Sequence, residues 1–429
     1  MNESNKNRIA AINSGSIPEG YKKTKVGIVP VEWVDTHFSE LFIEKKNVTS
    51  DFEKYPLYSL TIEEGVVPKS ERYERSHLIK KDDIFKIVSK NDFVYNPMNV
   101  RFGALARYKG QEDVSVSGYY DIFSVNESVS KEYMENFLLS KPMINYYNRV
   151  STGSLKEKQR VHFSQFLDFV LPIPPLPEQQ KIADILSTQD KLIELQEKKI
   201  EQLKELKKAY LQKMFPKKGS KYPELRFKGF TDPWEQRKLS ELLTPSDERN
   251  SDGKYTQDDV LAASLGTELV KKHIFFGLRS TEESVKNYRV VKSGDIIYTK
   301  SPIKGFPNGI VRTSKGAEGI VPSLYCVYKC TSSINPCIIQ SYLEDKTRLD
   351  AYLMPLVNIG ARNNVNITDL GFLEGTVMIP QDIEEQTKIV NLLDTLTELI
   401  TLHQRKSEQE KQKKKALMQL LLTGKVRCI

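Results

Sequence analysis

The side chains best suited to reading a nucleic acid lie in two glycine-punctuated loops. Arg, Lys, Asn and Gln can hydrogen bond to base edges, and basic groups can anchor phosphates. One such loop follows the segment NDFVY (91–95) and the other follows the segment GDIIY (294–298). The candidates in these two loops are Asn96, Asn99, Arg101, Arg107, Lys109, Lys300, Lys304, Asn308 and Arg312.

A second pair of polar loops surrounds Gly153 and Gly360, which lie 207 residues apart. Loops are polar whatever their function, so a single charged loop residue carries little information. The same kind of loop at equivalent places in two halves of a chain favours nucleic-acid binding more strongly. This pair adds the candidates Lys158, Arg160, Arg362, Asn363 and Asn364.

The motifs that catalysis would need do not occur in the sequence. The nearest approach to the base-gripping tetrad of an amino-methyltransferase is Asn96-Pro97-Met98-Asn99, which lacks the second proline and the aromatic residue. No phosphate-binding GxxxxGK[ST] loop, HExxH motif or paired CxxC is present. We therefore expect no catalytic residue and no metal site, and we expect the four cysteines to be buried or free thiols.

A long internal repeat determines where the candidate loops fall. The segment EQQKIADIL (178–186) aligns with EQTKIVNLL (385–393), 207 residues later. Upstream, Trp33 and the following SEL segment match Trp234 and its own SEL, at an offset of 201. The ends of the two copies agree and their middles diverge, which indicates a shared frame that presents different polar residues. Duplication without functional divergence is the alternative.

Each copy ends in a segment without Gly or Pro, 179–215 and 386–422, which predicts a long helix. Apolar residues recur there at alternating spacings of four and three, as in a coiled coil. If a pseudo-twofold axis relates the repeats, the two helices pack antiparallel. The predicted seam consists of Ile182, Leu186, Ile193, Ile200, Leu203, Ile389, Leu393, Leu396 and Ile400.

The fold class that these patterns predict is α+β, with two similar domains separated by two long antiparallel coiled-coil helices. The short apolar runs between Gly, Pro and Asn clusters in each middle favour mixed helix and strand. The predicted order is a flexible N-terminal segment (1–20), a first domain (21–176), a first helix (177–215), a basic linker (216–229), a second domain (230–383), a second helix (384–422) and a tail (423–429).

The composition of the chain suits a polyanionic partner without proving one. Lys and Arg outnumber Asp and Glu by 64 to 56, which gives a formal net charge of +8. The N-terminus lacks the apolar stretch of a secretory signal, and no apolar run is long enough to cross a membrane. We therefore expect a cytoplasmic protein with no membrane partner.

The arrangement resembles the specificity subunit of type I restriction-modification systems over nearly the whole chain. The most specific parts are IPPLPEQQKIADIL, the stretch YPELRFKGFTDPWEQRKLSEL that opens the second half, and IEEQTKIVNLLD. The resemblance implies a bacterial subunit whose variable middles are target-recognition domains, each reading one part of a bipartite site in double-stranded DNA. It also implies that the helices set the spacer and dock two modification subunits.

By the same resemblance, this chain binds no cofactor itself. The modification subunits would supply S-adenosylmethionine-dependent adenine methylation, and restriction subunits would supply ATP- and Mg-dependent translocation and cleavage. The end of the second helix, HQRKSEQEKQKKKALMQ, is more polar than the first helix, and leaves open whether the tail meets DNA, the N-terminus or a partner. A coiled-coil interaction scaffold with no nucleic-acid role is the alternative function.

Overall fold

The computed structural model describes residues 3–69, 85–154, 159–265, 269–271, 281–303, 305–331, 333–359 and 365–428. The chain forms two compact units. The first contains Met1–Glu194 together with Glu408–Ile429, and the second contains Leu195–Ser407. Each long helix therefore contributes residues to both units, whereas the predicted domain order places each helix outside the two domains.

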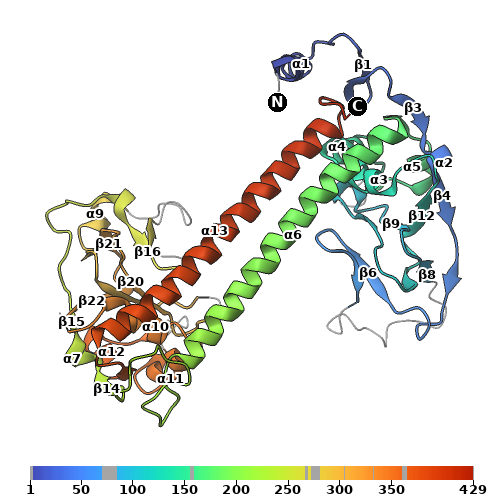
Figure 1. Ribbon diagram of the computed structural model, residues 1–429. Coiled ribbons are helices and arrows are strands. Elements are labelled where there is room, and N and C mark those ends of the chain that lie inside the picture. Colours follow the sequence, from blue (N-terminus) through green and yellow to red (C-terminus); the bar gives the residue numbers. More distant parts are fainter. Residues whose placement is uncertain are drawn as a thin grey trace. The chain divides into compact units, whose positions relative to one another are not determined.

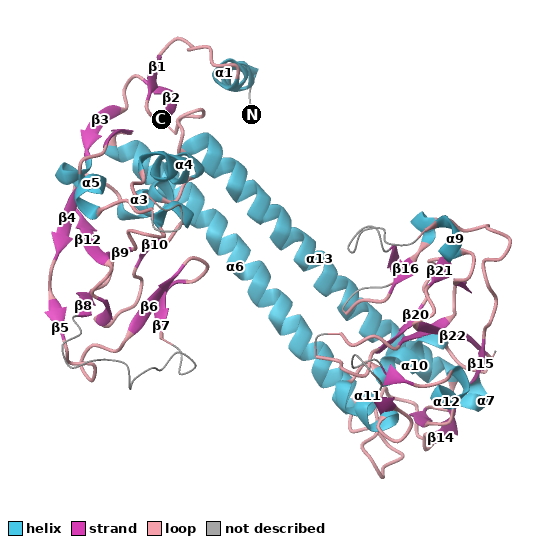
Figure 2. Cartoon of the chain, turned by 180° about the vertical axis from the view of Figure 1, so that it is seen from behind, coloured by secondary structure: helices cyan, strands magenta, loops and turns pink. Residues whose placement is uncertain are grey.

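The first unit contains an α+β domain built on an antiparallel four-stranded sheet (Figure 2). Its strand order is β10-β9-β12-β4, with bounds Leu105–Arg107, Phe93–Tyr95, Asp121–Val125 and Phe42–Lys45. Aromatic residues from this sheet and from the helices beside it form the core, where Phe93 stacks on Phe123 at 5.1 Å between ring centroids. The helices are α2 (Phe38–Leu41), α3 (Lys131–Leu138), α4 (Lys141–Val150) and α5 (Phe163–Leu167).

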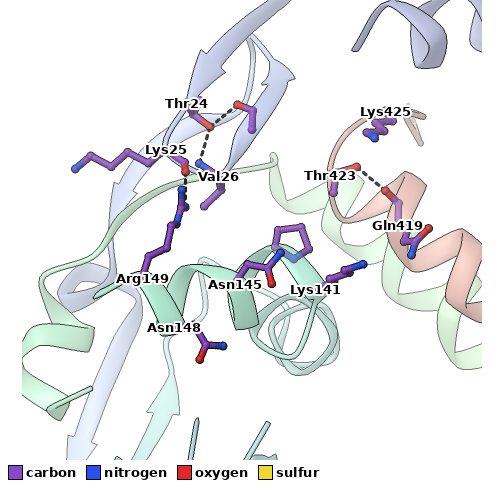
Figure 3. Close-up of a pocket in the computed structure, with 12 residues that line it drawn as sticks. Thr24, Lys25, Val26, Lys141, Asn145, Asn148, Arg149, Gln419, Thr423 and Lys425 are labelled. Carbon is purple, nitrogen blue, oxygen red and sulfur yellow. Dashed lines mark hydrogen bonds between the residues drawn. The ribbon is translucent and has the colours of Figure 1, made fainter. Parts of the chain in front are cut away.

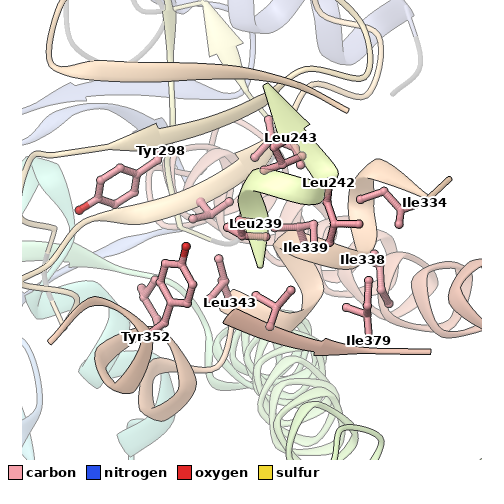
Figure 4. Close-up of a cluster of buried hydrophobic side chains, with 14 of the residues drawn as sticks. Leu239, Leu242, Leu243, Tyr298, Ile334, Ile338, Ile339, Leu343, Tyr352 and Ile379 are labelled. Carbon is pink, nitrogen blue, oxygen red and sulfur yellow. The ribbon is translucent and has the colours of Figure 1, made fainter. Parts of the chain in front are cut away.

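The second unit repeats this plan with other residues. Its four-stranded sheet has the order β20-β19-β22-β15, with bounds Ile310–Thr313, Ile296–Thr299, Tyr325–Cys330 and Leu243–Pro245. The core of this domain is more aliphatic, and Figure 4 shows Leu239, Leu242, Ile338 and Ile339 among its buried residues. The helices are α7 (Leu239–Leu242), α10 (Pro336–Leu343), α11 (Lys346–Leu353) and α12 (Asp369–Leu373).

The two domains share the order of their main elements, including the four-stranded sheets in the middles whose sequences diverge. In each domain the opening strand pairs antiparallel with the strand that leads into the long helix: β3 (Val34–His37) with β13 (Val170–Ile173), and β14 (Glu235–Lys238) with β25 (Thr376–Ile379). The predicted α+β class and internal repeat are confirmed. The equivalent central strands β9 and β19 are buried at every residue, so apolar and aromatic character there, rather than residue identity, is what the two middles share.

Shorter elements complete the described chain. In the first unit they are β1 (Tyr21–Thr24), β2 (Gly27–Pro30), β5 (Val48–Thr49), β6 (Tyr58–Thr61), β7 (Gly65–Pro68), β8 (Phe85–Val88), η3 (Val100–Phe102) and β11 (Val114–Ser117). In the second they are η5 (Gln257–Asp259), β16 (Leu261–Ala262), β17 (Val270–Lys271), α9 (Glu282–Val285), β18 (Arg289–Val291), β21 (Gly319–Val321), β23 (Asn358–Ile359) and β24 (Val365–Asn366).

The two long helices are α6 (Leu176–Lys213) and α13 (Ile383–Leu421), close to the predicted bounds (Figure 1). Within the second unit, Ile200 and Leu203 of α6 cluster with Leu396 and Ile400 of α13, and Gln196 contacts His403 at 2.7 Å. Residue numbers that rise along α6 meet numbers that fall along α13, so the helices are antiparallel here. In the first unit the two helices also contact each other, where Gln189 bonds Glu410 and Asp190 pairs with Lys414.

The predicted seam residues lie in three buried clusters. Ile200, Leu203, Leu396 and Ile400 form a separate cluster between the helices. Ile182 and Leu186 cluster with Leu421 of α13 and with the core of the first domain, whereas Ile389 and Leu393 cluster with Leu211 of α6 and with the core of the second. Ile193 is half-buried. The ends of the seam therefore pack on a domain as well as on the partner helix.

The N-terminal segment and the tail are more ordered than predicted. Residues expected to be flexible form helix α1 (Glu3–Asn13). The tail packs on the N-terminal part of the chain: the Tyr21 hydroxyl donates to the Gly424 carbonyl at 2.9 Å. The tail therefore meets the N-terminus, one of the three possibilities that the sequence left open. Among the described residues no helix is long and apolar enough to cross a membrane.

Candidate nucleic-acid interface

In the first domain the fold brings two of the predicted loops together. The loop after β9 turns through η3, and Arg101 donates from Nη1 to Gln159 Oε1 in the loop that precedes α5, at 3.2 Å. The Val161 amide also donates to the Pro97 carbonyl at 3.0 Å. Arg160 pairs with Thr152 through backbone hydrogen bonds of 2.9 Å in both directions. The loops that contain Asn99, Arg101 and Arg160 thus form one surface.

The residues of this surface divide into structural and exposed ones. Asn96 is only 8% exposed, and its Oδ1 accepts from the amides of Met98 and Asn99, so its side chain holds the turn. Asn99 is exposed. Phe102, which sequence reasoning missed, is 56% exposed, and the Arg101 guanidinium lies 4.4 Å from its ring centroid. Arg101 is itself only 8% exposed, so the exposed Phe102 ring is the part of this pair on which a base could stack.

Arg107 and Lys109 have protein partners. Arg107 donates from Nη2 to Glu135 at 2.9 Å and from Nη1 to Glu132 at 3.2 Å, and its side chain is only 10% exposed. Lys109 also pairs with Glu135, at 2.6 Å, but its side chain is 65% exposed. Arg107 therefore has a structural role as the partner of two glutamates on α3, whereas the Lys109 side chain remains accessible.

In the second domain the predicted residues are more strongly engaged. Asn308 donates to Asp350 at 3.0 Å, and Lys300 lies 3.7 Å from Asp369. Arg312 is 3% exposed and donates from Nε to the Ser264 carbonyl and from Nη1 to the Val311 carbonyl. Burial lowers the pKa of Arg312. An arginine buried on a strand cannot reach a base edge without unfolding, so the geometry argues against base readout by Arg312.

Five of the predicted residues lie outside the described residues: Lys158, Lys304, Arg362, Asn363 and Asn364. Of the others, Asn99 and Lys109 in the first domain have exposed side chains that a nucleic acid could contact, whereas Arg101 is only 8% exposed and Lys300 is partly buried beside Asp369. Their DNA-binding roles stay predictions.

The start of each long helix carries a buried clamp that sequence reasoning did not identify. Glu178 is 5% exposed and accepts hydrogen bonds from the Trp33 Nε1 at 3.1 Å and from Arg427 at 2.7 and 3.0 Å. In the second unit Glu385 is 1% exposed and accepts from Trp234 at 3.4 Å and from Arg226 at 2.7 and 2.9 Å. The matched PEQQ and EEQ segments are therefore structural.

The glutamine that follows each glutamate fixes the domain to its helix. Gln179 Oε1 accepts from the Ser130 amide at 2.9 Å and its Nε2 donates to the Pro174 carbonyl at 2.8 Å. Gln386 makes the same pair of bonds, with the Asn335 amide and the Pro380 carbonyl, both at 2.8 Å. Arg226, a cation of the basic linker, is bound by Glu385, and this hydrogen bonding raises the pKa of Arg226.

No cluster of His, Cys, Asp and Glu suited to a metal occurs within the described ranges. Cys326 is buried and the other three cysteines are partly buried, all as free thiols. Burial raises the pKa of the Cys326 thiol to about 11, so at neutral pH it is protonated and unreactive. The site offers hydrogen-bonding and charged groups on loops, an arrangement that suits binding.

Comparisons with known proteins agree with this reading. The chain is 24% identical to the MjaX type I restriction enzyme specificity subunit of Methanocaldococcus jannaschii, covering 95% of this chain and 97% of that protein. It is 28% identical to the MjaVIII specificity subunit of the same organism, over 61% of this chain and 63% of that one.

The crystal structure of a type I restriction-modification S subunit from M. genitalium has a similar fold. Its TM-score is 0.56 at 12% identity, and the match covers 91% of this chain and 96% of that one. The type I restriction modification DNA specificity domain matches twice, at residues 30–205 and 231–412. These two matches span most of the chain, and the chain belongs to the family of type I restriction-modification specificity subunits.

Proposed function

We propose that this chain is the non-catalytic, sequence-reading subunit of a type I restriction-modification complex, and that each domain reads one part of a bipartite DNA target. The observation that supports this most is that the two domains share one scaffold but carry different residues in their equivalent loops. The same sheet order carries Asn99, Arg101 and Phe102 in one half and a different set around Lys300 in the other. Two similar domains with different loop residues suit the recognition of two different half-sites.

The chemistry would reside on other chains. Two modification subunits would bind S-adenosylmethionine and methylate adenine, and restriction subunits would use ATP and Mg to translocate and cut. A scaffold without a nucleic-acid role, the alternative from the sequence, is not favoured by a double match to a DNA specificity domain.

The long helices would set the spacer between half-sites. Thirty-eight residues of α6 rise about 57 Å at 1.5 Å per residue. Residues Gln196–Gln202 face Thr397–His403, because Gln196 meets His403 and Leu203 clusters with Leu396. The heptad to remove from α13 is therefore 397–403, whereas the repeat alone suggests 403–409. Deleting both facing heptads shortens the rods by about 10 Å, or about three base pairs.

Methylome sequencing of a host with and without this gene tests the proposal. The expected result is a split adenine-methylation motif with an undefined spacer that disappears when the gene is deleted. A complex with both facing heptads deleted should recognise the same half-sites at a shorter spacer. Loss of no motif on gene deletion would contradict the proposed function, and an unchanged spacer would reject only the role of the helices.

A further inference from the structure

A small cavity of about 310 Å³ in the first unit lies between the start of α4 and the last turns of α13. Its lining contains Lys141, Lys411, Lys414 and Lys415 and, among the described residues, no carboxylate. A larger neighbouring cavity shares Lys141 with it and adds Lys25, Arg149 and Lys425. Figure 3 shows Lys141 extending from α4 towards the last turns of α13. The electrostatic environment therefore favours an anion.

The start of α4 supplies neutral donors to this cavity. Helix α4 has ten residues, and the first amides of a helix have no acceptor within it. Ser140 occupies the capping position and is only 3% exposed, but its hydroxyl makes no capping bond. The Ser140 Oγ has no hydrogen-bond partner in the described part of the chain. A buried hydroxyl in a cavity lining without a partner is unfavourable unless a ligand satisfies it.

The same place in the second half is already filled by carboxylates. Helices α10 and α11 begin 205 residues after α3 and α4, so Glu344 and Asp345 correspond to Leu139 and Ser140. Asp345 caps α11 by accepting from the Arg348 amide at 3.0 Å. Glu344 pairs at 2.9 Å with Lys207, the equivalent of Lys414 at the helix offset of 207. The first half keeps the lysines and the helix start but lacks both carboxylates.

We propose that this cavity is a binding site for a phosphate group, present in the first half of the chain only. A phosphate oxyanion would accept from the Ser140 hydroxyl and from the amides of Lys141 and Met143, since Pro142 has no N–H, in line with the helix dipole. Lys141 and Lys415 would supply charge, and Lys414 would share its charge with Asp190, its ion-pair partner at 2.5 Å. The phosphate can belong to the backbone of bound DNA or to a free anion.

The first test uses the full chain with inorganic phosphate as the probe. We expect the melting temperature of the chain to be higher in phosphate than in chloride at equal ionic strength. The double variant Leu139→Glu/Ser140→Asp should abolish this rise, because it installs the residues that the second half carries on the same scaffold. Lys141→Gln, which removes one charge of the site, should reduce the rise, whereas its charge-matched control Lys198→Gln on the exposed face of α6 should leave the rise unchanged.

A second experiment identifies the source of the phosphate and does not depend on sequence-specific recognition of DNA. The affinity of the full chain for duplex DNA is measured against salt concentration. If the phosphate belongs to DNA, the slope of log affinity against log salt should fall by about one in the double variant. An unchanged slope in a double variant that has lost the phosphate effect would assign the site to a free anion.

Three results would overturn the proposal. The first is a wild-type chain that phosphate stabilises no more than chloride does, and the second is a Lys198→Gln variant that loses the effect as fully as Lys141→Gln does. The third is a double variant that keeps the phosphate effect; if that variant also fails to assemble with the modification subunits, the surface is a protein-docking face. None of these results bears on whether the domains read DNA.

Discussion

The two buried clamps have the same geometry but receive their arginine from different parts of the chain. In the second half, Arg226 comes from the linker that follows α6 and binds Glu385. In the first half, Arg427 comes from the C-terminal tail and binds Glu178, with a further contact to Glu32 at 2.8 Å. The second clamp is held by an internal segment and the first by a chain end.

This difference shows that one clamp can be completed in two ways. In the second half the arginine and the tryptophan of the clamp lie eight residues apart in one segment, Arg226 and Trp234. In the first half Arg427 and Trp33 lie in distant segments, which further bonds hold together: the Tyr21 hydroxyl donates to the Gly424 carbonyl, and Lys425 donates to Asn13 at 2.6 Å. Long-range contacts therefore do in the first half what a short connection does in the second.

The largest expected effect comes from removing a clamp carboxylate. Glu385→Ala leaves Arg226 and the Trp234 ring nitrogen without their acceptor, and we expect it to destabilise the second unit by about 3 kcal/mol. The neighbouring Glu384 is exposed and pairs only with Lys388, so Glu384→Ala is the matched control and should cost less than about 1 kcal/mol. Urea denaturation measures both, and equal losses would show that the clamp has no special role.

The next prediction distinguishes the two clamps directly. Ending the chain after Thr423 removes Arg427 and should lower amide hydrogen-exchange protection around Trp33 and the start of α6, while the start of α13 keeps its protection. Arg226→Ala should do the reverse. Each loss of a charged hydrogen-bonded pair is expected to cost about 1.5–3 kcal/mol locally. Protection that falls in both units after truncation would contradict the assignment of each arginine to one half.

A third prediction compares the candidate DNA-contacting residues of the two domains. Asn99→Ala should weaken recognition of one half-site by about 1–3 kcal/mol without changing the other, and Lys300→Ala should affect only the other half-site. Arg312→Ala should lower the stability of the second unit before any effect on sequence preference, since its guanidinium is buried. Binding to duplexes altered in one half-site at a time measures the first two effects, and melting measures the third.

The smallest effect concerns acid stability and is confined to the second half. Burial alone would raise the pKa of Asp369, but the hydrogen bond and charge of Arg289, 2.5 Å away, together with Cys326 and Lys300, lower it below its usual value. A carboxyl with a depressed folded pKa stabilises the fold above its unfolded pKa, and this contribution is lost as pH falls through the folded value. Asp369→Asn should therefore lower the free energy of unfolding at neutral pH. The difference in this free energy between variant and wild type should shrink below about pH 4. A difference independent of pH would reject the ion pair.

The sequence predicted the frame of the molecule well because the frame depends on patterns. Helix bounds, the α+β class and the repeat follow from apolar periodicity and from the absence of Gly and Pro in the long helices. The clamps were missed because Trp33, Glu178 and Arg427 lie far apart in the sequence, and no local spacing joins them. The signal was present in the repeat: Trp33 and Glu178 match Trp234 and Glu385 as buried polar partners.

The candidate readers were predicted less well, for a related reason. Residue type and loop position do not show whether an arginine faces solvent, bonds to backbone carbonyls or pairs with carboxylates on a neighbouring helix. Arg107 and Arg312 share the composition of DNA-reading residues but satisfy Glu135 and backbone carbonyls respectively. Phe102 was overlooked because an isolated aromatic residue in a loop usually packs inward, and its exposure depends on the turn at Gly103, where φ is +98°.

The most direct test of the account is a hybrid chain whose residues 21–176 come from a relative of known specificity, expressed with its modification subunits and followed by methylome sequencing. We predict a split motif in which one half-site is that of the relative, while the other half-site and the spacer length are unchanged. A motif in which both half-sites change, or an active complex that methylates an unsplit site, would contradict the claim that two independent readers share one duplicated frame.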